Sequence, residues 1–316
     1  MKKLSIIIVN YNTSEELAVC IKSIIQYTKD IHYEIIVVDN NSQDDSKIIL
    51  KEKFEEVKSF FLCKNMGYSF ANNYGLQRCD SEYILILNPD TYLWEDSISK
   101  MVRFMDGHPD IGVLGPDLKD IHGRSQLPAS RFPGLMQQLF EALFLKIILH
   151  RIARTKKQKE SLAQNIPFEV DWIAGACFLL RRNVYLEVGG LDNEFFLYNE
   201  DVEWCLRIKK AGWRIFCYPK TCVIHLQGAS TYKDHYLLVL SRYKSKFIYA
   251  RKHFSNLDYI ALHIIVISGL SLRIVGSVFR NFTNTKERND RILGYYHSIL
   301  IWLHIGNVSK DLRKSY

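Results

Sequence analysis

Residues 81–96, "SEYILILNPDTYLWED", decide how this chain can be built. The apolar run at 83–87 is typical of a buried strand, and the polar residues at 88–90 end it abruptly. Asn-Pro-Asp is a favourable turn sequence, because proline presets φ and Asn and Asp bond to their own backbone. A turn alone explains this stretch as well as a ligand site does, so the choice depends on the neighbouring strands.

Composition indicates a globular chain with a basic tail. The 316 residues are 47% hydrophobic and 24% charged, which suits one large α/β domain with appendages and excludes extensive disorder. The net charge of +8 is uneven, because residues 242–316 hold 13 Lys/Arg against 4 Asp/Glu. The tail therefore carries +9, and the rest of the chain about −1.

Two features bear on the compartment. The seven cysteines form no CxxC pair, and several lie in apolar runs, so we expect reduced thiols in a cytosolic protein. The apolar run after the two N-terminal lysines lasts only from Leu4 to Val9. This run is too short for the core of a signal peptide, and we expect it to be the first strand.

The first 90 residues alternate between strand and helix patterns. Helical patterns lie near 14–24, 44–56 and 69–79, and Thr13 with Glu16 suggests a capping box for the first of them. Expected strands are 4–9, 34–40, 58–63 and 83–87. This alternation predicts an α/β fold with a mostly parallel sheet flanked by helices, and the absence of G-x-G-x-x-G after the first strand excludes the dinucleotide-binding fingerprint.

The remainder is less regular. We expect strands at 112–118 and 170–182, a helix at 200–211 ended by Gly212, and two short strands at 214–219 and 222–228. Residues 135–160 are apolar and then basic. We therefore expect a domain over 1–235, with 135–160 as an insertion able to face a membrane, and a helical membrane-associating region over 236–316.

Polar residues follow each of the first four strands. In a parallel sheet, ligands bind outside the carboxyl ends of the strands. The residues there are Asn10, Tyr11, Asn12, Asp39, Asn40, Asn41, Asn65, Gly67, Asn88 and Asp90. Turn preference explains any one of them, whereas the whole set suits the base, ribose and phosphates of a nucleotide.

Two later positions add chemistry. Glu200 and Asp201 open a helix, where the helix dipole favours carboxylates, and the aromatic stretch before them would desolvate a carboxylate and raise its pKa. His225 ends a strand; it is either a structural histidine or, with Asp90, an N/O ligand of a divalent metal that suits a diphosphate.

Six segments in order resemble one family: "SIIIVNYN", "EIIVVDNNSQD", "KNMGYSFANNYG", "LNPD", "NEDVEWCLR" and "HLQGAS". Over roughly residues 3–232 the chain resembles the inverting family 2 glycosyltransferases with a GT-A fold, most of all bacterial rhamnosyl- and galactofuranosyltransferases. The resemblance does not cover the tail. The Q-x-x-R-W signature of processive synthases is absent, so transfer of one or a few sugars is expected.

The resemblance implies roles for matching residues. Asp201 would be the general base, with Glu200 beside it, and Asp90 with His225 would hold Mn²⁺ or Mg²⁺, although Asn88 stands where much of the family has the first acid of Asp-x-Asp. Trp172, Gly175 and Ala176 would lie on the acceptor side. The implied nucleotide site comprises Asn10, Tyr11, Asn12, Asp39, Asn65, Gly67, Asn72 and Asn88.

The tail indicates a membrane rather than nucleic acid. Residues 259–279 are apolar over a length that could span a bilayer, but Arg273 and His263 oppose spanning. An interfacial helix, a buried helix and a span all stay open; basic flanks suit an anionic membrane surface, and 139–154 resembles a second membrane-facing helix. The long apolar runs lack the pattern expected for nucleic acid.

Two hypotheses of function follow. The first is a glycosyltransferase, peripheral on the cytoplasmic face of a bacterial inner membrane, that moves a single sugar from a TDP-rhamnose-like or UDP-sugar donor to a lipid-linked or cell-envelope glycan acceptor. The second is a non-catalytic nucleotide-sugar-binding scaffold subunit of an envelope polysaccharide assembly complex. A nucleotidyltransferase would need a glycine-rich phosphate loop near the first strand, and the sequence has none there.

Overall fold

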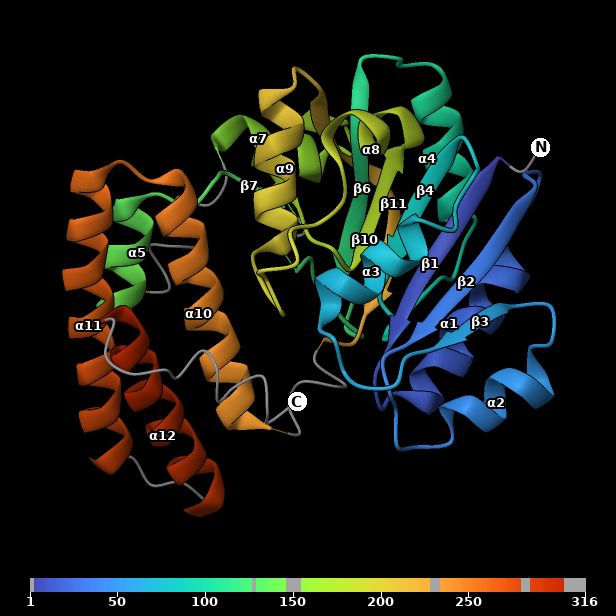
Figure 1. Cartoon of the computed structure of the whole chain (residues 1–316). Helices are drawn as coiled ribbons and strands as arrows, with labels where there is room; N and C mark the ends of the chain where they lie inside the picture. Colours follow the sequence, from blue (N-terminus) through green and yellow to red (C-terminus); the bar gives the residue numbers. More distant parts are fainter. Residues whose placement is uncertain (1–2, 127–128, 146–154, 228–233, 280–284, 304–316) are drawn as a thin grey trace. The chain divides into compact units, whose positions relative to one another are not determined.

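The computed structural model describes residues 3–126, 129–145, 155–227, 234–279 and 285–303 (Figure 1). The chain forms two compact units. The first contains residues 1–132, 155–193 and 200–230, and the second contains 133–154, 194–199 and 231–316. The last segment of the second unit begins close to the boundary expected at residue 235, and two earlier segments of the chain join it.

One mixed sheet forms the centre of the first unit. Its strands are β1 (Leu4–Asn10), β2 (Tyr33–Asp39), β3 (Lys58–Phe61), β4 (Tyr83–Leu87), β5 (Thr91–Tyr92), β6 (Ile111–Lys119), β8 (Phe168–Glu169), β10 (Cys177–Arg181) and β11 (Arg214–His225). The order is β3-β2-β1-β4-β10-β6-β11-β5, with β8 paired to β11. The expected α/β fold with a mostly parallel N-terminal sheet is confirmed, because β1 to β4 pair only in parallel with one another.

Helices cover both faces of this sheet. On β1, Ile6 and Ile8 belong to the core that packs α1 (Ser14–Tyr27), α2 (Ser46–Lys53) and α4 (Ser97–Asp106). Ile7 and Val9 face the other core, which packs α3 (Tyr68–Leu76), α8 (Arg182–Val188) and α9 (Glu200–Lys210). Alternate residues thus bury on opposite faces, which explains why these strands read as continuous apolar runs.

The strand expected at 170–182 is broken in the structure. Residues 174–176 separate β9 (Trp172–Ile173), which pairs with β7 (Ala129–Ser130), from β10, which runs antiparallel between β4 and β6. The prediction of one strand was wrong, because Ala-Gly-Ala has little preference for extended structure. The Gly175 amide bonds to a side chain instead of a strand neighbour.

Two smaller expectations were also wrong. The two strands expected at 214–219 and 222–228 are one strand, β11, whose register with β6 shifts between Tyr218 and Cys222, where Pro219 lacks an amide donor. The capping box at the start of α1 is absent among the described contacts. The Thr13 hydroxyl donates to Asn10 Oδ1 at 2.7 Å instead.

The second unit is helical, as expected for the C-terminal appendage. Its helices are α5 (Leu135–Ala142), α10 (His235–His253), α11 (Asn256–Phe279) and α12 (Thr285–Trp302). Glycines permit close packing: a Cβ on Gly269 would lie 2.8 Å from Ala142 Cβ, and one on Gly294 would lie 2.9 Å from Val239 Cβ. Of the second membrane-facing helix expected at 139–154, residues 146–154 lie outside the described residues.

Candidate active site

The carboxyl ends of β1, β2 and β4 meet at one edge of the sheet. Asn10 pairs in register with Asp39, and Leu87, just before Asn88, pairs with Ile8. The polar residues that the sequence places after these strands therefore lie at one edge, as the topology requires.

Asn10 acts as a scaffold within this edge. Its side chain is fully buried, and its amide donates to Asp39 Oδ2 at 2.8 Å and to Ser46 Oγ at 2.8 Å. Its Oδ1 accepts from Thr13. Asp39 is held from its other oxygen by the Ser42 amide at 2.9 Å. Asn10 therefore orients Asp39, whose carboxylate oxygens keep further acceptor capacity.

The adjoining loops are fixed by similar bonds. The Asn12 amide donates to Ser42 Oγ at 2.9 Å, and Asn12 Oδ1 accepts from the Gln43 amide at 2.7 Å. Asn12 adopts a φ of 55°, which asparagine tolerates, and Tyr11 beside it is half-buried. The loop after β1 is thereby tied to the loop after β2.

The loop after β3 is attached to β2 by Asn40, which belongs to the strand-end set but not to the nucleotide site implied by the resemblance. Asn40 is buried, donates to Asn65 Oδ1 at 2.7 Å and accepts from the Met66 amide at 2.8 Å. Gly67 follows with a φ of 86°, which favours glycine. Asn72, one turn into α3, is fully buried, and its Oδ1 has no partner among the described residues.

Asn88 is joined to two distant segments. Its backbone N–H donates to the Ala176 carbonyl at 3.0 Å, and its side-chain Oδ1 lies 3.0 Å from the Tyr68 hydroxyl. The same hydroxyl lies 3.0 Å from the Gly175 carbonyl oxygen. Asn88 thus connects the start of α3 with the link between β9 and β10.

Asp90 and His225 meet, as the sequence suggested. His225 Nε2 lies 3.3 Å from Asp90 Oδ1, and both side chains are largely buried. His225 Nδ1 contacts Gln126 Oε1 at 3.0 Å, which leaves Nε2 directed toward Asp90. Among the described residues no group of three His, Cys, Asp or Glu side chains could form a closed metal cage. One carboxylate and one imidazole fit a divalent ion that is shared with a diphosphate.

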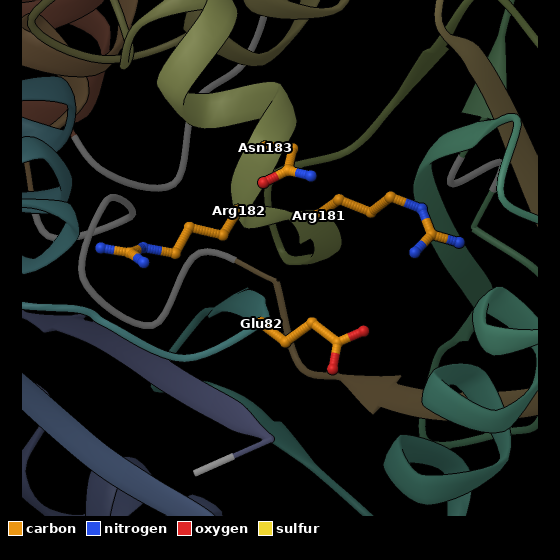
Figure 2. Close-up of a pocket in the computed structure, with 4 residues that line it drawn as sticks. All are labelled: Glu82, Arg181, Arg182 and Asn183. Carbon is orange, nitrogen blue, oxygen red and sulfur yellow. The ribbon is translucent and has the colours of Figure 1, made fainter. Parts of the chain in front are cut away.

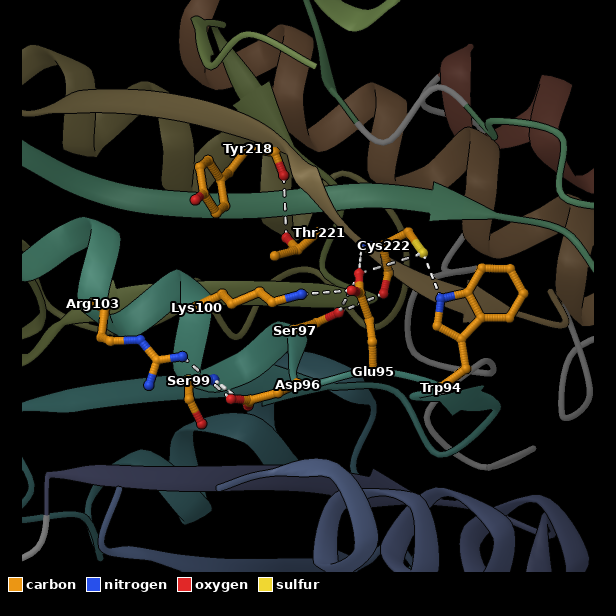
Figure 3. A network of polar contacts seen from close by, with 10 residues as sticks. All are labelled: Trp94, Glu95, Asp96, Ser97, Ser99, Lys100, Arg103, Tyr218, Thr221 and Cys222. Carbon is orange, nitrogen blue, oxygen red and sulfur yellow. Dashed lines mark hydrogen bonds and ion pairs between the residues drawn. The ribbon is translucent and has the colours of Figure 1, made fainter. Parts of the chain in front are cut away.

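A polar network ties the segment that follows β5 to β11 (Figure 3). Ser97 Oγ donates to the Cys222 carbonyl at 2.7 Å, and Glu95 Oε2 pairs with Lys100 at 2.6 Å. Trp94 Nε1 donates to Cys222 Sγ at 2.8 Å. Since β5 also pairs with β11 at His225, these contacts fix the spacing between Asp90 and His225.

Asp201 is held by backbone amides at the start of α9. Gly175 N–H donates to Asp201 Oδ2 at 2.9 Å, and Val202 N–H donates to Oδ1 at 2.8 Å. Of the three residues expected on the acceptor side, Gly175 lies beside Asp201, Ala176 is buried, and Trp172 is half-buried with its indole bonded to the Arg131 carbonyl.

Burial sets the charge of the Glu200–Asp201 pair. Burial raises the pKa of Asp201, and the Gly175 and Val202 amides oppose this rise. Burial and the nearby Asp201 charge raise the pKa of Glu200 well above its ordinary value, and Glu200 Oε2 has no partner among the described residues. Of the two groups, Glu200 therefore holds a proton more tightly, and a single negative charge on the pair is placed on Asp201.

The pocket in Figure 2 lies elsewhere. It has a volume of about 330 Å³ and is lined by Glu82, Arg181, Arg182 and Asn183, which stand at the start of β4 and the end of β10. This is the sheet edge opposite Asn88, and the two arginine side chains point away from each other. Arg181 is committed to structure, since its Nε donates to the Ile111 carbonyl at 2.8 Å.

Comparisons with known proteins agree with this geometry. Residues 5–189 match the family model described as glycosyl transferase family 2, and the chain belongs to that family. It is therefore a glycosyltransferase, and the resemblance drawn from the six motifs is confirmed.

The chain is similar to two rhamnosyltransferases. It is 26% identical over 226 residues to the N-acetylglucosaminyl-diphospho-decaprenol L-rhamnosyltransferase of Mycobacterium tuberculosis, covering 68% of this chain and 73% of that protein. It is 28% identical over 209 residues to rhamnosyltransferase WbbL of Escherichia coli K12, covering 62% of this chain and 74% of that protein.

Solved structures support the GT-A fold. The mannosyltransferase PcManGT from Pyrobaculum calidifontis, in complex with GDP-Man and Mn²⁺, matches 95% of this chain and 86% of its own with a TM-score of 0.56 and 12% identity. GalNAc-T7 with UDP, GalNAc and Mn²⁺ matches 79% of this chain and 51% of its own with a TM-score of 0.56 and 18% identity.

Glu200→Gln should remove a pH-dependent cost of folding. Because the folded-state pKa of Glu200 is raised, its contribution to stability is complete below the unfolded pKa and is lost as pH rises toward the folded pKa. The unfolding free energy of the variant should therefore exceed that of the wild type by more at pH 8 than at pH 5, by about 1.4 kcal/mol for each unit of pKa difference.

Urea unfolding at both pH values measures this difference. Glu187→Gln, at a carboxylate that receives the Trp213 indole N–H at the surface, is a matched control. An equal difference between Glu200→Gln and wild type at the two pH values would show that Glu200 is ionised in the folded protein.

Proposed function

We propose that this glycosyltransferase moves a single sugar from a TDP-rhamnose-like or UDP-sugar donor to a lipid-linked or cell-envelope glycan, with inversion and with Asp201 as the general base. The observation that carries the proposal is the half-buried Asp201, held by two backbone amides beside the buried Glu200, whose pKa is raised well above its ordinary value. The rhamnosyltransferase relatives support the donor and acceptor classes.

Asp201 would accept the proton of an acceptor hydroxyl while that oxygen bonds to the anomeric carbon. The bond from this carbon to the diphosphate oxygen breaks in the same step, and the nucleoside diphosphate leaves with the electron pair. Burial makes Asp201 a stronger base than an exposed aspartate, because it raises the pKa. The raised pKa of Glu200 favours its neutral form, which would add no second charge to repel the departing diphosphate.

Asp90 and His225 would hold the divalent ion, and Asp39 with the strand-end loops would hold the nucleoside. Such an ion, when bound, neutralises charge on the leaving diphosphate. Asp90 would supply one carboxylate where an Asp-x-Asp motif supplies two, and His225, whose Nε2 lies 3.3 Å from Asp90 Oδ1, would supply the second ligand. The half-buried Tyr11 ring would stack on the base.

Asp201→Asn should lower the transfer rate by about 10²- to 10⁴-fold, since it removes the base and keeps the shape of the side chain. Transfer is measured as nucleoside diphosphate release, with TDP-L-rhamnose and UDP-sugars as donors and an N-acetylglucosaminyl-diphospho-lipid as acceptor. Asp110→Asn, at an exposed carboxylate that pairs with Arg214, is the control. If Asp201→Asn turned over at the wild-type rate, the assignment would be refuted. If the wild-type protein bound nucleotide but transferred no sugar, the scaffold hypothesis would be favoured.

One nucleotide among UDP, TDP and GDP should raise the melting temperature of the protein only when Mn²⁺ or Mg²⁺ is present. A ligand at 100 times its dissociation constant adds ~2.7 kcal/mol, a shift of several degrees. Asp90→Asn should abolish the metal-dependent part of the shift, and EDTA should do the same to the wild type. A shift that is equal in EDTA would remove the metal role of Asp90 and His225.

The second unit offers a surface for a membrane. Within the described residues, α11 is long and apolar enough to span a membrane by length and composition. Its Arg273 turns inward, where Nη2 donates to the Glu141 carbonyl at 2.7 Å and the guanidinium lies over the Phe144 ring. The exposed apolar residues of α11 are Leu257, Ile260, Ile264, Leu272, Val275, Val278 and Phe279. We infer that α11 lies on an anionic cytoplasmic leaflet, a peripheral location, with the nearby Lys286 contributing about 1 kcal/mol.

Ile264→Glu with Val275→Glu should weaken binding to vesicles that contain phosphatidylglycerol, because both side chains are more than half exposed on the apolar face of α11. Flotation of the purified chain with the vesicles measures this. Ile48→Glu, at a similarly exposed position on α2, should leave flotation unchanged. Equal flotation of all three proteins would exclude α11 as the membrane surface.

A further inference from the structure

Three segments far apart in sequence meet at the hydroxyl group of Tyr68. This hydroxyl lies 3.0 Å from Asn88 Oδ1, at the end of β4, and 3.0 Å from the carbonyl oxygen of Gly175, between β9 and β10. We propose that Tyr68 is a positioning residue, whose hydroxyl fixes Gly175 and through it the orientation of Asp201. The inference rests on the proposed role of Asp201 as the base.

Gly175 is held from both sides. Tyr68 bonds to its carbonyl oxygen, and its amide donates to Asp201 Oδ2 at 2.9 Å. A Cβ at position 175 would lie 3.3 Å from the Tyr68 hydroxyl and 3.7 Å from Asp201 Cβ, so the glycine fits closely between the two side chains. Each neighbour is held by one backbone bond: the Ala174 carbonyl accepts from the Cys177 N–H at 3.4 Å, and the Ala176 carbonyl accepts from the Asn88 N–H at 3.0 Å.

The hydroxyl keeps its proton in this setting. Burial raises the pKa of Tyr68 well above its ordinary value, and the negative charge of the nearby Glu200–Asp201 pair raises it further. A phenol carries one proton, so it can donate fully to only one of its two neighbours. The Gly175 carbonyl can only accept, whereas the Asn88 amide can turn its NH₂ group toward the phenol oxygen. With that amide turned, Asn88 donates to Tyr68 and Tyr68 donates to Gly175.

This arrangement gives a reason for asparagine at position 88. A carboxylate there could only accept, and a charged acceptor would compete with the neutral Gly175 carbonyl for the single phenolic proton. Asn88→Asp would thus restore two acids around Pro89 and at the same time loosen Gly175. Its effect on Gly175 should depend on the presence of the Tyr68 hydroxyl.

Hydrogen exchange of the Gly175 amide, followed by NMR on the full chain, tests the restraint without any substrate. Tyr68→Phe should speed this exchange about 2- to 10-fold, the range expected for one lost hydrogen bond. Tyr74→Phe removes a hydroxyl from the same helix, outside the site, and should not change it. Asn88→Asp should speed the exchange in the wild-type background and add little to Tyr68→Phe.

Kinetics supply a second readout that a purely structural residue would not give. Tyr68→Phe should lower kcat about 2- to 10-fold and leave KM for the nucleotide-sugar donor unchanged, because only the orientation of Asp201 is affected. Unchanged Gly175 exchange in Tyr68→Phe, or an equal effect of Tyr74→Phe, would overturn the inference even if transfer is confirmed. Absence of transfer by the wild type would instead refute the proposed function, and the exchange rates would still decide whether Tyr68 restrains Gly175.

Discussion

The hydrogen bond from the Gly175 amide to the Asp201 carboxylate is the constraint on which the rest of the site depends. A buried carboxylate needs donors to stay ionised, and the 2.9 Å bond from Gly175 supplies one that strand pairing would otherwise consume. The interruption between β9 and β10 leaves this amide available. Burial, and then the charge on Asp201, raise the pKa of Glu200. One bond therefore links a break in the sheet, the glycine at that break and the charge of the proposed base.

On the opposite side of the site, the polar residues at strand ends are of two kinds. Some bond to other residues of the protein, and others are the proposed ligand contacts. The side chains of Asn10 and Asn40 form hydrogen bonds within the protein. Asn10 fixes Asp39, and Asn40 fixes the loop after β3. Asp90 and His225 are brought together because β5, which follows Asp90, pairs with β11, which ends at His225. The segment after β5 is also bonded to β11, since Glu95 and Ser97 both contact Cys222. Bonds between neighbouring loops thereby fix the edge of the sheet that we propose faces the nucleotide.

Local pattern was enough to predict most of the fold and part of the site. Buried apolar runs alternating with helices predicted the parallel strands β1 to β4, and polar strand ends predicted the meeting of Asp90 with His225. The contact between Tyr68 and Gly175 joins residues 107 positions apart, so no local pattern contains it. The antiparallel direction of β10 is likewise a tertiary property, set by its pairing with β4 and β6. The break at 174–176 did have a local signal, since Ala-Gly-Ala has little preference for extended structure, and the surrounding apolar residues outweighed that signal in the sequence prediction. Tyr68, within the segment "KNMGYSFANNYG", was the residue that could have pointed to this contact.

The central claim is that Asp201 faces the anomeric carbon of a sugar whose diphosphate lies at Asp90 and His225. A crystal structure of the Asp201→Asn protein with Mn²⁺ and the intact donor tests it most directly. We expect the side chain of residue 201 on the face of the anomeric carbon opposite the diphosphate, with Asp90 and His225 at the metal ion. A diphosphate bound away from Asp90, or a residue 201 side chain on the same face as the leaving group, would contradict the account.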